Sequence, residues 1–191
     1  MKLSSIRDLA SLKAVLFDPN TTGPDPAYWL FTEVSHDKWF NNTILPPGKH
    51  GQEYNKTFGH YHPDGAPNET YQVIYGEGLF IMQKKDLSEV CLVKVKTGDE
   101  VVITPVWGHA LINTGSLPVI TFDDWRIGHT PADYSAIEQL HGMAYYLIDE
   151  AGQPKVAANP HYEKLPEPQW ISAEEFSRHI YFNSSLSSSS S

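Results

Sequence analysis

The sequence predicts an all-β fold, a small sandwich or barrel built mainly from antiparallel strands. Short runs of β-branched and aromatic residues follow one another from residue 27 to residue 122, separated by turns that contain glycine or proline. No helical pattern stands between these runs, which argues against alternating β–α–β units. The length of 191 residues allows one well-buried core, so we predict a single domain over residues 1–183.

The strands are expected between a helical N-terminus and a helical C-terminus. Apolar residues from Leu3 to Lys13 recur at helical spacing, and Ser4 and Ser5 are possible helix caps. Gly76-Glu77-Gly78 is expected to form a tight hairpin between two neighbouring strands. The predicted strand ranges are 27–34, 39–45, 70–75, 79–83, 89–95, 100–104, 110–113 and 119–122.

The final third of the chain mixes helix and hairpin signals. A short helix is expected over residues 132–141, followed by a hairpin of residues 142–148 and 155–157. Ser172 and Glu175 have the spacing of a capping box, which predicts a helix through His179. Residues 184–191 are nearly all serine and cannot bury apolar surface, so we expect a disordered tail there.

Composition excludes several classes of partner. The formal net charge of −9 argues against nucleic acid or an anionic membrane, because both attract clustered lysine and arginine. Cys91 is the only cysteine and lies in an apolar run, so it is expected to pack rather than to react. Residues 1–14 lack the apolar core of a signal peptide, and no apolar run reaches membrane-spanning length. We therefore expect a cytoplasmic protein.

The segment from residue 59 to residue 71 carries the most informative pattern. His60 and His62 alternate, so on a strand both side chains point to one face. Glu69 opens the next β-prone run, and His109 follows another such run after Pro105. Three imidazoles and one carboxylate can fill four positions around a divalent metal and leave others open for a substrate.

The remaining histidines do not share this arrangement. Taken singly, they are interpreted as solvated or hydrogen-bonded structural residues: His36, His50, His161 and His179. A lone His-x-His pair is itself a weak signal. Glu69, Gly76 and the run from Pro105 through His109 to Asn113 strengthen it, because the glycine and the proline determine where strands turn.

These residues resemble the two motifs of the cupin superfamily, small jelly-roll barrels that hold a metal inside. The first motif is matched by His60-x-His62, Glu69 and Gly76, and the second by Gly98, Pro105, His109 and Asn113. The insert from Pro63 to Asn68 is longer than in most cupins. This insert resembles the cupin-type (archaeal-type) glucose-6-phosphate isomerase family, and the similarity covers roughly residues 25–165, including the segments 43–53, 57–62, 107–115, 132–134 and 159–160.

The resemblance implies reversible interconversion of glucose 6-phosphate and fructose 6-phosphate, a step of glycolysis and gluconeogenesis. The implied metal ligands are His60, His62, Glu69 and His109. Fe(II) is the expected ion, and Mn(II), Ni(II) and Zn(II) remain alternatives because a ligand set of three nitrogens and one oxygen suits all of them. The resemblance also implies a homodimer.

The chemistry assigns further roles. A metal with open positions can hold the C1 and C2 oxygens of an open-chain sugar, and Glu69 is the best placed base to carry a proton between the two carbons. Tyr71 lies on the same strand face and can position the sugar oxygens, although a packed barrel aromatic explains it equally well. Proton transfer and hydride transfer both remain open.

The phosphate must be held away from the metal. By resemblance, the residues that contact it are Thr43, Thr57, Gly59 and Tyr134. Phe58 stands where the family carries lysine, and Ala132 where some relatives carry a histidine thought to aid ring opening or proton transfer. We hypothesise that His129 or Arg126 compensates for Ala132.

Two other classes of function compete with the isomerase. A metal-dependent cupin dioxygenase would share the same ligands, and oxygen consumption without isomerisation would identify it. The third hypothesis is a non-catalytic cupin that binds sugar. The intact ligand set weighs against it, because a pure binding module does not need four metal ligands.

Overall fold

The computed structural model describes residues 1–34 and 37–187, so His36 lies outside the described residues. The strands are β1 (Lys2–Arg7), β2 (Tyr28–Thr32), β3 (Asn41–Leu45), β4 (Lys49–His50), β5 (Glu53–Tyr54), β6 (Glu69–Tyr75), β7 (Glu77–Lys84), β8 (Val90–Lys96), β9 (Glu100–Ile103), β10 (Trp107–Ile112), β11 (Val119–Asp123), β12 (Tyr145–Glu150), β13 (Gln153–Ala158) and β14 (Gln169–Ser172). The helices are α1 (Leu9–Leu12), the 3₁₀ turn η1 (Lys13–Val15), α2 (Pro131–Gln139) and α3 (Ala173–Ser187).

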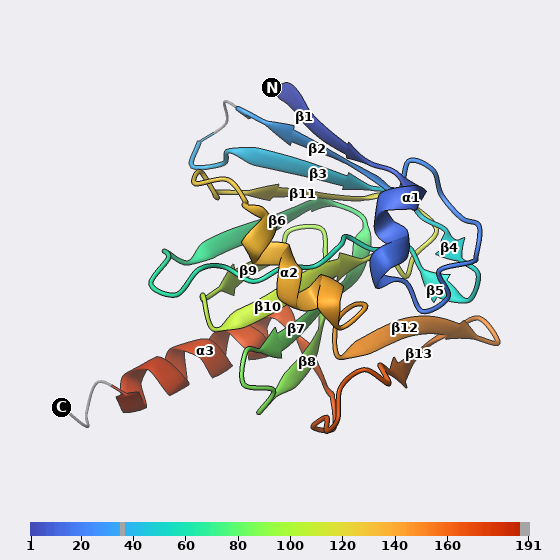
Figure 1. Cartoon of the computed structure of the whole chain (residues 1–191). Helices are drawn as coiled ribbons and strands as arrows, with labels where there is room; N and C mark the ends of the chain where they lie inside the picture. The colour runs from blue at the N-terminus through green and yellow to red at the C-terminus, as the bar shows by residue number, and fades with distance from the viewer. Residues whose placement is uncertain (35–36, 188–191) are drawn as a thin grey trace.

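The described strands form one six-stranded sheet and two four-stranded sheets. The first sheet has the order β1-β2-β3-β11-β6-β9, and the second has the order β10-β7-β8-β14. The third, β13-β12-β5-β4, lies at one end of the molecule beside α1 (Figure 1). Neighbouring strands are antiparallel except for β14, which runs parallel to β8. This topology confirms the predicted all-β jelly-roll barrel of the cupin type.

The barrel core lies between the first sheet and the second sheet. β7 has the buried run Leu79–Gln83, and β10 is buried along its whole length from Trp107 to Ile112. Such continuous burial is typical of strands whose two faces are both covered. The site residues on β6 and β10 therefore project from a rigid, closely packed part of the fold.

The turn at Gly76 differs from the prediction. β6 and β7 are consecutive in the chain, but they belong to different sheets, so Gly76 forms a corner between the sheets and not a hairpin. Its φ of +82° is a left-handed conformation, and an added Cβ would lie 2.2 Å from the carbonyl oxygen of Pro118. Only glycine fits this close approach of two backbones.

The N-terminal prediction is wrong in its first half. Residues 2–7 form β1, which pairs antiparallel with β2, and helix is confined to α1 and the η1 turn that follows it. Leu3 and Ile6 are exposed at this sheet edge, so their helical spacing does not report burial. Backbone pairing with β2 outweighs the local pattern, as tertiary context commonly does. The Asp8 side chain caps α1 by accepting from Ser11 N at 2.7 Å.

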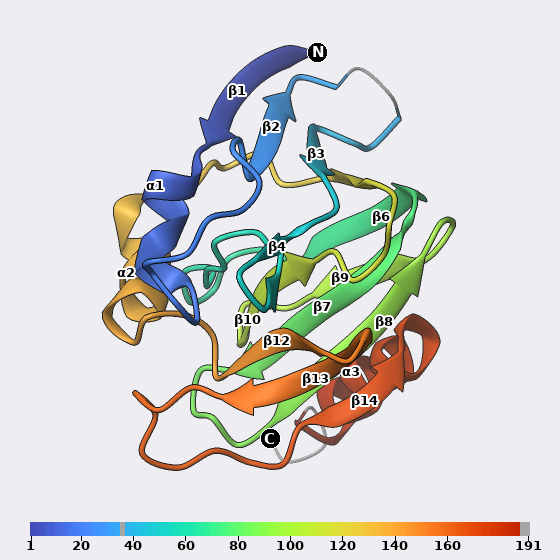
Figure 2. The ribbon, with the colours of Figure 1, turned by 90° about the vertical axis from the view of Figure 1, so that its right-hand side faces the viewer.

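The C-terminal elements agree with the sequence. Helix α2, the β12–β13 hairpin and α3 are all present, as Figure 2 shows from the side. Ser172 Oγ accepts from Glu175 N at 3.2 Å, and Ser172 N donates to the Glu175 carboxylate at 2.7 Å, which is the predicted capping box. The helix continues beyond His179 to Ser187, so the prediction of a disordered tail is wrong for residues 184–187, and residues 188–191 lie outside the described residues.

Four strands were not expected from local patterns, namely β1, β4, β5 and β14. β4 and β5 have two residues each, and β14 forms by pairing with β8, which lies far away in sequence. Cys91 is fully buried on β8, and burial raises the pKa of its thiol to about 12, as expected of a packing residue. No helix within residues 1–34 and 37–187 is both long and apolar enough to cross a membrane.

Candidate metal centre

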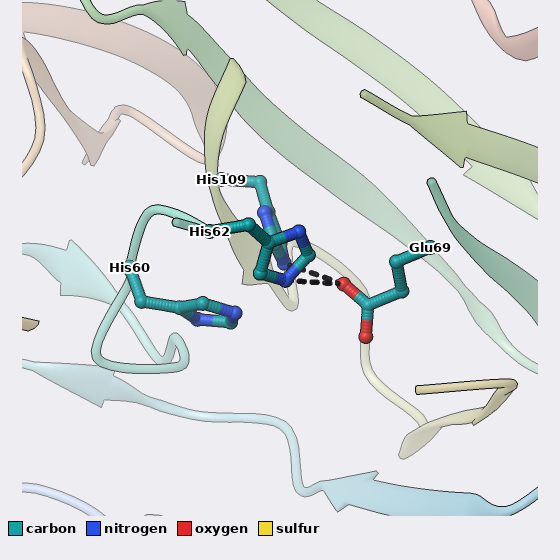
Figure 3. A group of neighbouring side chains, drawn as sticks. All are labelled: His60, His62, Glu69 and His109. Carbon is teal, nitrogen blue, oxygen red and sulfur yellow. Dashed lines mark ion pairs between the residues drawn. The ribbon is translucent and has the colours of Figure 1, made fainter. Parts of the chain in front are cut away.

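His60 and His62 reach the site from a loop rather than from a strand. Residues 57–68 lack strand structure except for one bridge, in which His60 N donates to His109 O at 3.1 Å and His109 N donates to His60 O at 3.0 Å. The expected alternation is preserved, because both imidazoles project toward the same centre (Figure 3). This bridge ties the first histidine pair directly to β10.

Glu69 and His109 complete the cluster from two different sheets. Glu69 is the first residue of β6, and His109 lies in the middle of β10. One ligand atom from each of His60, His62, Glu69 and His109 lies within 4.8 Å of all the others. Glu69 Oε2 lies 3.2 Å from His62 Nε2 and 3.4 Å from His109 Nε2 (Figure 3).

The donor atoms of this cluster are free to bind an ion. His60 Nε2, His62 Nδ1 and His109 Nδ1 are buried without a hydrogen-bond partner among the described residues, whereas Nε2 of His62 and of His109 faces the Glu69 carboxylate. An unsatisfied buried polar atom costs about 1–3 kcal/mol, so several in one place need an explanation. A divalent metal that takes the nitrogen lone pairs provides one, and three imidazoles with one carboxylate suit first-row ions.

The protonation states also fit metal ligands. Burial lowers the pKa of His109. Burial, followed by the charges of neighbouring histidines, lowers the pKa of His60 well below its usual range. Burial alone would raise the pKa of Glu69, but hydrogen bonds from His109 and His62 outweigh it and lower the pKa to about 2. Neutral imidazoles and an ionised carboxylate are the forms that bind metals.

The unusual insert is held against the barrel. Lys85 Nζ donates to the carbonyl oxygen of His62 at 2.8 Å and pairs with Asp64 Oδ1 at 2.5 Å. The His62 ring stacks on Trp125, with ring centroids 4.0 Å apart and an interplanar angle of 6°. These contacts fix the orientation of His62 although its backbone belongs to no strand.

A pocket of about 360 Å³ opens beside the cluster, within the size range of small-molecule sites. Two proposed metal ligands, His60 and His109, line it. All of the substrate and catalytic candidates outside the ligand set line it as well: Thr43, Thr57, Gly59, Tyr71, His129 and Tyr134.

Tyr71 and His129 stand closest to the histidines. The Tyr71 hydroxyl lies 3.5 Å from His109 Nε2, and burial, with the charge of Glu69 next, raises its pKa well above the usual value. The ring centroid of His129 lies 4.1 Å from that of His60, and burial lowers the pKa of His129 to about 4. Ala132 is exposed and does not line this pocket, whereas His129 and Arg126 do.

The local sequence places His129 and Tyr134 by capping α2. Thr130 N donates to Asp133 Oδ2 at 2.7 Å, and Pro131 occupies the first helical turn, where its missing N–H costs nothing. The helix therefore begins at a defined point between the two residues. His129 comes just before the helix and Tyr134 lies in its first turn.

The pocket lining includes Phe58 and the four residues that the sequence predicts to contact the phosphate, which we call the phosphate wall: Thr43, Thr57, Gly59 and Tyr134. Thr57 Oγ1 accepts from Leu111 N at 2.9 Å, so its hydroxyl proton stays available. Gly59 has a φ of +86°, and an added Cβ would lie 3.1 Å from Met143 Sδ. The Arg7 guanidinium lies over the rings of Phe58 and Tyr134, at 5.1 and 5.9 Å from their centroids.

The sequence analysis missed the pocket residues Asn41, Asp123 and Trp125, and also Arg7, which contacts the rings of Phe58 and Tyr134. Asp123 falls one residue beyond the predicted strand 119–122, so its side chain was not assigned to a strand face. Arg7 had no local signal, because it arrives on β1, which was expected to be helix. The other histidines lie apart from the cluster: His50 contacts Asn55 at 2.9 Å, His179 contacts Glu89 at 2.9 Å, and His161 packs on His141.

A family model described as "Glucose-6-phosphate isomerase (GPI)" matches residues 32–164, which include the whole cluster. The chain belongs to the glucose-6-phosphate isomerase family. The glucose-6-phosphate isomerase of Thermococcus onnurineus is 34% identical over 169 residues, which cover 83% of this chain and 87% of the relative. That of Thermococcus kodakarensis is 33% identical over 170 residues, with the same coverage of 83% and 87%.

Solved structures show weaker likeness. The cupin domain of Drosophila melanogaster CENP-C is 10% identical, with a TM-score of 0.41, and the match covers 58% of this chain and 79% of that one. A predicted oxalate decarboxylase of Thermotoga maritima is 24% identical, with a TM-score of 0.37, and the match covers 50% and 76% of the two chains.

Proposed function

We propose that this protein interconverts glucose 6-phosphate and fructose 6-phosphate at a divalent metal held by His60, His62, Glu69 and His109. The convergence of these four side chains within 4.8 Å of one another, in a chain of the isomerase family, is the observation that carries the proposal. A bound divalent ion would supply Lewis-acid stabilisation of the charge that develops on the sugar oxygens. Fe(II) is the first ion to test, and Mn(II), Ni(II) and Zn(II) follow.

Glu69 is the proposed base. Isomerisation moves one proton from C2 to C1 of the open-chain sugar, while the C2 hydroxyl loses its proton and the C1 oxygen gains one. The Glu69 carboxylate is ionised because its pKa is lowered to about 2, so it can take the proton from C2 and return it to C1. A hydride shift between the same carbons is the alternative route.

Tyr71 and His129 are proposed to handle the oxygens. The Tyr71 hydroxyl is held beside His109 and is un-ionised at neutral pH, so it can donate a hydrogen bond to a sugar oxygen. His129 is a neutral imidazole on the pocket wall beside His60. Its free nitrogen can exchange the proton that moves between sugar oxygens, or the one released when the ring opens.

The phosphate wall is proposed to bind the phosphate group. Hydroxyl groups of Thr43, Thr57 and Tyr134 can donate to phosphate oxygens, and Gly59 lines the same pocket. Arg7 brings a positive charge to this wall, where the chain has Phe58 in place of a lysine. The aromatic faces of Phe58 and Tyr134 hold the guanidinium by cation–π contact.

A metal-reconstitution assay tests this function. The purified protein is treated with chelator, each of the four ions is added back in turn, and conversion of fructose 6-phosphate to glucose 6-phosphate is measured. We expect turnover only with added metal. No turnover with any ion would overturn the proposal, and oxygen consumption without isomerisation would identify the dioxygenase instead.

We also propose that the chain forms a homodimer in the cytoplasm, as the family resemblance implies. The exposed edge strand β1, with Leu3 and Ile6 on its surface, is one segment that a second copy can cover. Light scattering of the purified protein would measure the oligomeric state directly. A mass near 21.5 kDa at all concentrations would contradict the dimer.

A further inference from the structure

Asp123 is a second carboxyl group on the pocket wall, with an exposed fraction of 2%. It is the last residue of β11, and its register partners are Asn41 on β3 and Tyr71 on β6. Register partners on adjacent antiparallel strands project to the same face. All three residues line the pocket, so they form a row across three strands, which we call the polar row.

The carboxyl group of Asp123 is held in one orientation. Both hydrogen bonds described for it go to Oδ1, from Asn41 Nδ2 at 2.6 Å and from Trp125 N at 3.1 Å. The Asn41 amide also donates to the carbonyl oxygen of Trp125 at 2.7 Å, which fixes the amide itself. Oδ2 is therefore the oxygen that remains for a ligand in the pocket.

Burial of this carboxyl group is unfavourable in the absence of a ligand. Withdrawal from water, with the charge of Glu69 as the next cause, raises the pKa of Asp123 well above its usual range. Burying a carboxyl group costs free energy that a valine or leucine at this strand position would not. The hydrogen bonds from Asn41 and Trp125 satisfy Oδ1, and a polar ligand in the pocket would provide a partner for Oδ2.

The polar row leads away from the metal cluster. Tyr71 connects the two, because its hydroxyl lies 3.5 Å from His109 Nε2 and Glu69 precedes it by two residues on the same strand face. Residues related diagonally across neighbouring strands lie about 7–8 Å apart, which is the relation of Asp123 to Glu69. A sugar whose C1 and C2 oxygens lie at the cluster extends past this position.

We propose that Asp123 Oδ2 forms a hydrogen bond with the C3 or C4 hydroxyl of the open-chain sugar and so selects hexose phosphates that carry it. This inference rests on the proposed function, because it takes the sugar phosphate as the ligand. A site built to bind a substrate hydroxyl rejects analogues that lack it, since its buried polar group is then left unpaired. Asp123 is thus a specificity-determining residue.

The test compares the wild type with Asp123→Ala on glucose 6-phosphate and on its 3-deoxy and 4-deoxy analogues. For glucose 6-phosphate we expect kcat/KM to fall roughly 10- to 100-fold in the variant, the range for removing one partner of a buried hydrogen bond. For one deoxy analogue the two proteins should agree within about threefold, because the lost contact is already absent. An equal loss on all three substrates, or no loss on glucose 6-phosphate, would overturn the inference.

Two further variants separate binding from folding. Asp123→Asn keeps an oxygen for Asn41 and Trp125, so it retains the buried contacts and replaces the alanine variant if that variant does not fold. It is expected to show the same pattern of losses across the three substrates as predicted for Asp123→Ala. Asp124→Asn is the matched control, since Asp124 accepts from Thr70 N at 2.8 Å and lies outside the pocket lining. It should keep wild-type kinetics within about twofold.

A binding measurement keeps this inference distinct from the proposed function. Glucitol 6-phosphate has the same C3 and C4 hydroxyls but no carbonyl group, so it binds without reacting. Calorimetry should show that Asp123→Ala binds this ligand more weakly than the wild type does. If this loss of affinity is seen while the wild type fails to isomerise glucose 6-phosphate, only the proposed function fails. Equal affinity in both proteins would refute the role of Asp123.

Discussion

The two functional parts of the pocket are assembled in different ways. The metal cluster takes three donors from residues 60–69 and a fourth from β10, and its side chains contact one another directly. The phosphate wall draws on β3, the loop before His60 and helix α2, and the Arg7 guanidinium from β1 lies over the rings of Phe58 and Tyr134. The first part is a compact motif, whereas the second is a surface contributed by segments that are distant in sequence.

This difference has a chemical reason. A metal requires particular donor atoms within a narrow range of distances, so few residue types can replace one another there. A phosphate dianion accepts hydrogen bonds from hydroxyls, backbone N–H groups or a guanidinium, so its binding site tolerates exchange of one donor for another. We therefore expect large losses from single changes in the cluster and graded losses in the wall.

The largest effect is expected for His109→Ala. Removing this ligand should lower kcat/KM roughly 10,000-fold, because Lewis-acid stabilisation is worth several kcal/mol and each 1.4 kcal/mol is tenfold in rate. Metal content, measured by mass spectrometry after dialysis, should fall in parallel. His161→Ala is the matched control, since His161 packs on His141 outside the cluster. Full activity without His109 would remove it from the metal site.

Glu69→Gln separates the proposed base from the metal ligand. The amide oxygen can still contact the ion but cannot accept the carbon-bound proton, so kcat should fall roughly 1000-fold, within the range of general-base losses. The measurement pairs steady-state kinetics with metal content per subunit. A variant that retains both metal and wild-type turnover would show that Glu69 is not the base.

His129→Ala is expected to act on kcat more than on KM. Loss of a proton carrier for the sugar oxygens should lower kcat roughly 100-fold, the lower part of the general acid–base range. Metal content should stay at the wild-type level, because His129 contacts His60 by its ring and is not one of the four donors. Unchanged turnover would mean that His129 does not compensate for Ala132.

Arg7→Met should give the smallest effect and reveal the graded character of the wall. Losing the guanidinium beside Phe58 and Tyr134 should raise KM for fructose 6-phosphate roughly tenfold with little change in kcat, since a charged hydrogen bond is worth about 1.5–3 kcal/mol. Arg178→Met is the control, because Arg178 pairs with Glu174 on α3, far from the pocket lining. If both variants bind substrate equally well, Arg7 does not contact the phosphate.

Much of the fold could be predicted because its signals are local. Alternation and turn residues located most strands of the first and second sheets, and the Ser172–Glu175 capping box located the start of α3. Gly76 was found as a turn residue, but its role as a corner depends on Pro118, which is distant in sequence. β1 was missed because pairing with β2, and not its own pattern, makes it a strand.

The sequence by itself determined which residues can serve as metal ligands. Residue type determines the donor atoms, and the spacing from His60 to Glu69, together with His109, is visible in the sequence. Only the tertiary structure decided what surrounds the substrate. It brings Arg7 onto Phe58, aligns Asn41, Asp123 and Tyr71 across three strands, and places His129 rather than Ala132 in the pocket. The physical reason is that sheet register and strand order bring together side chains that no local pattern connects.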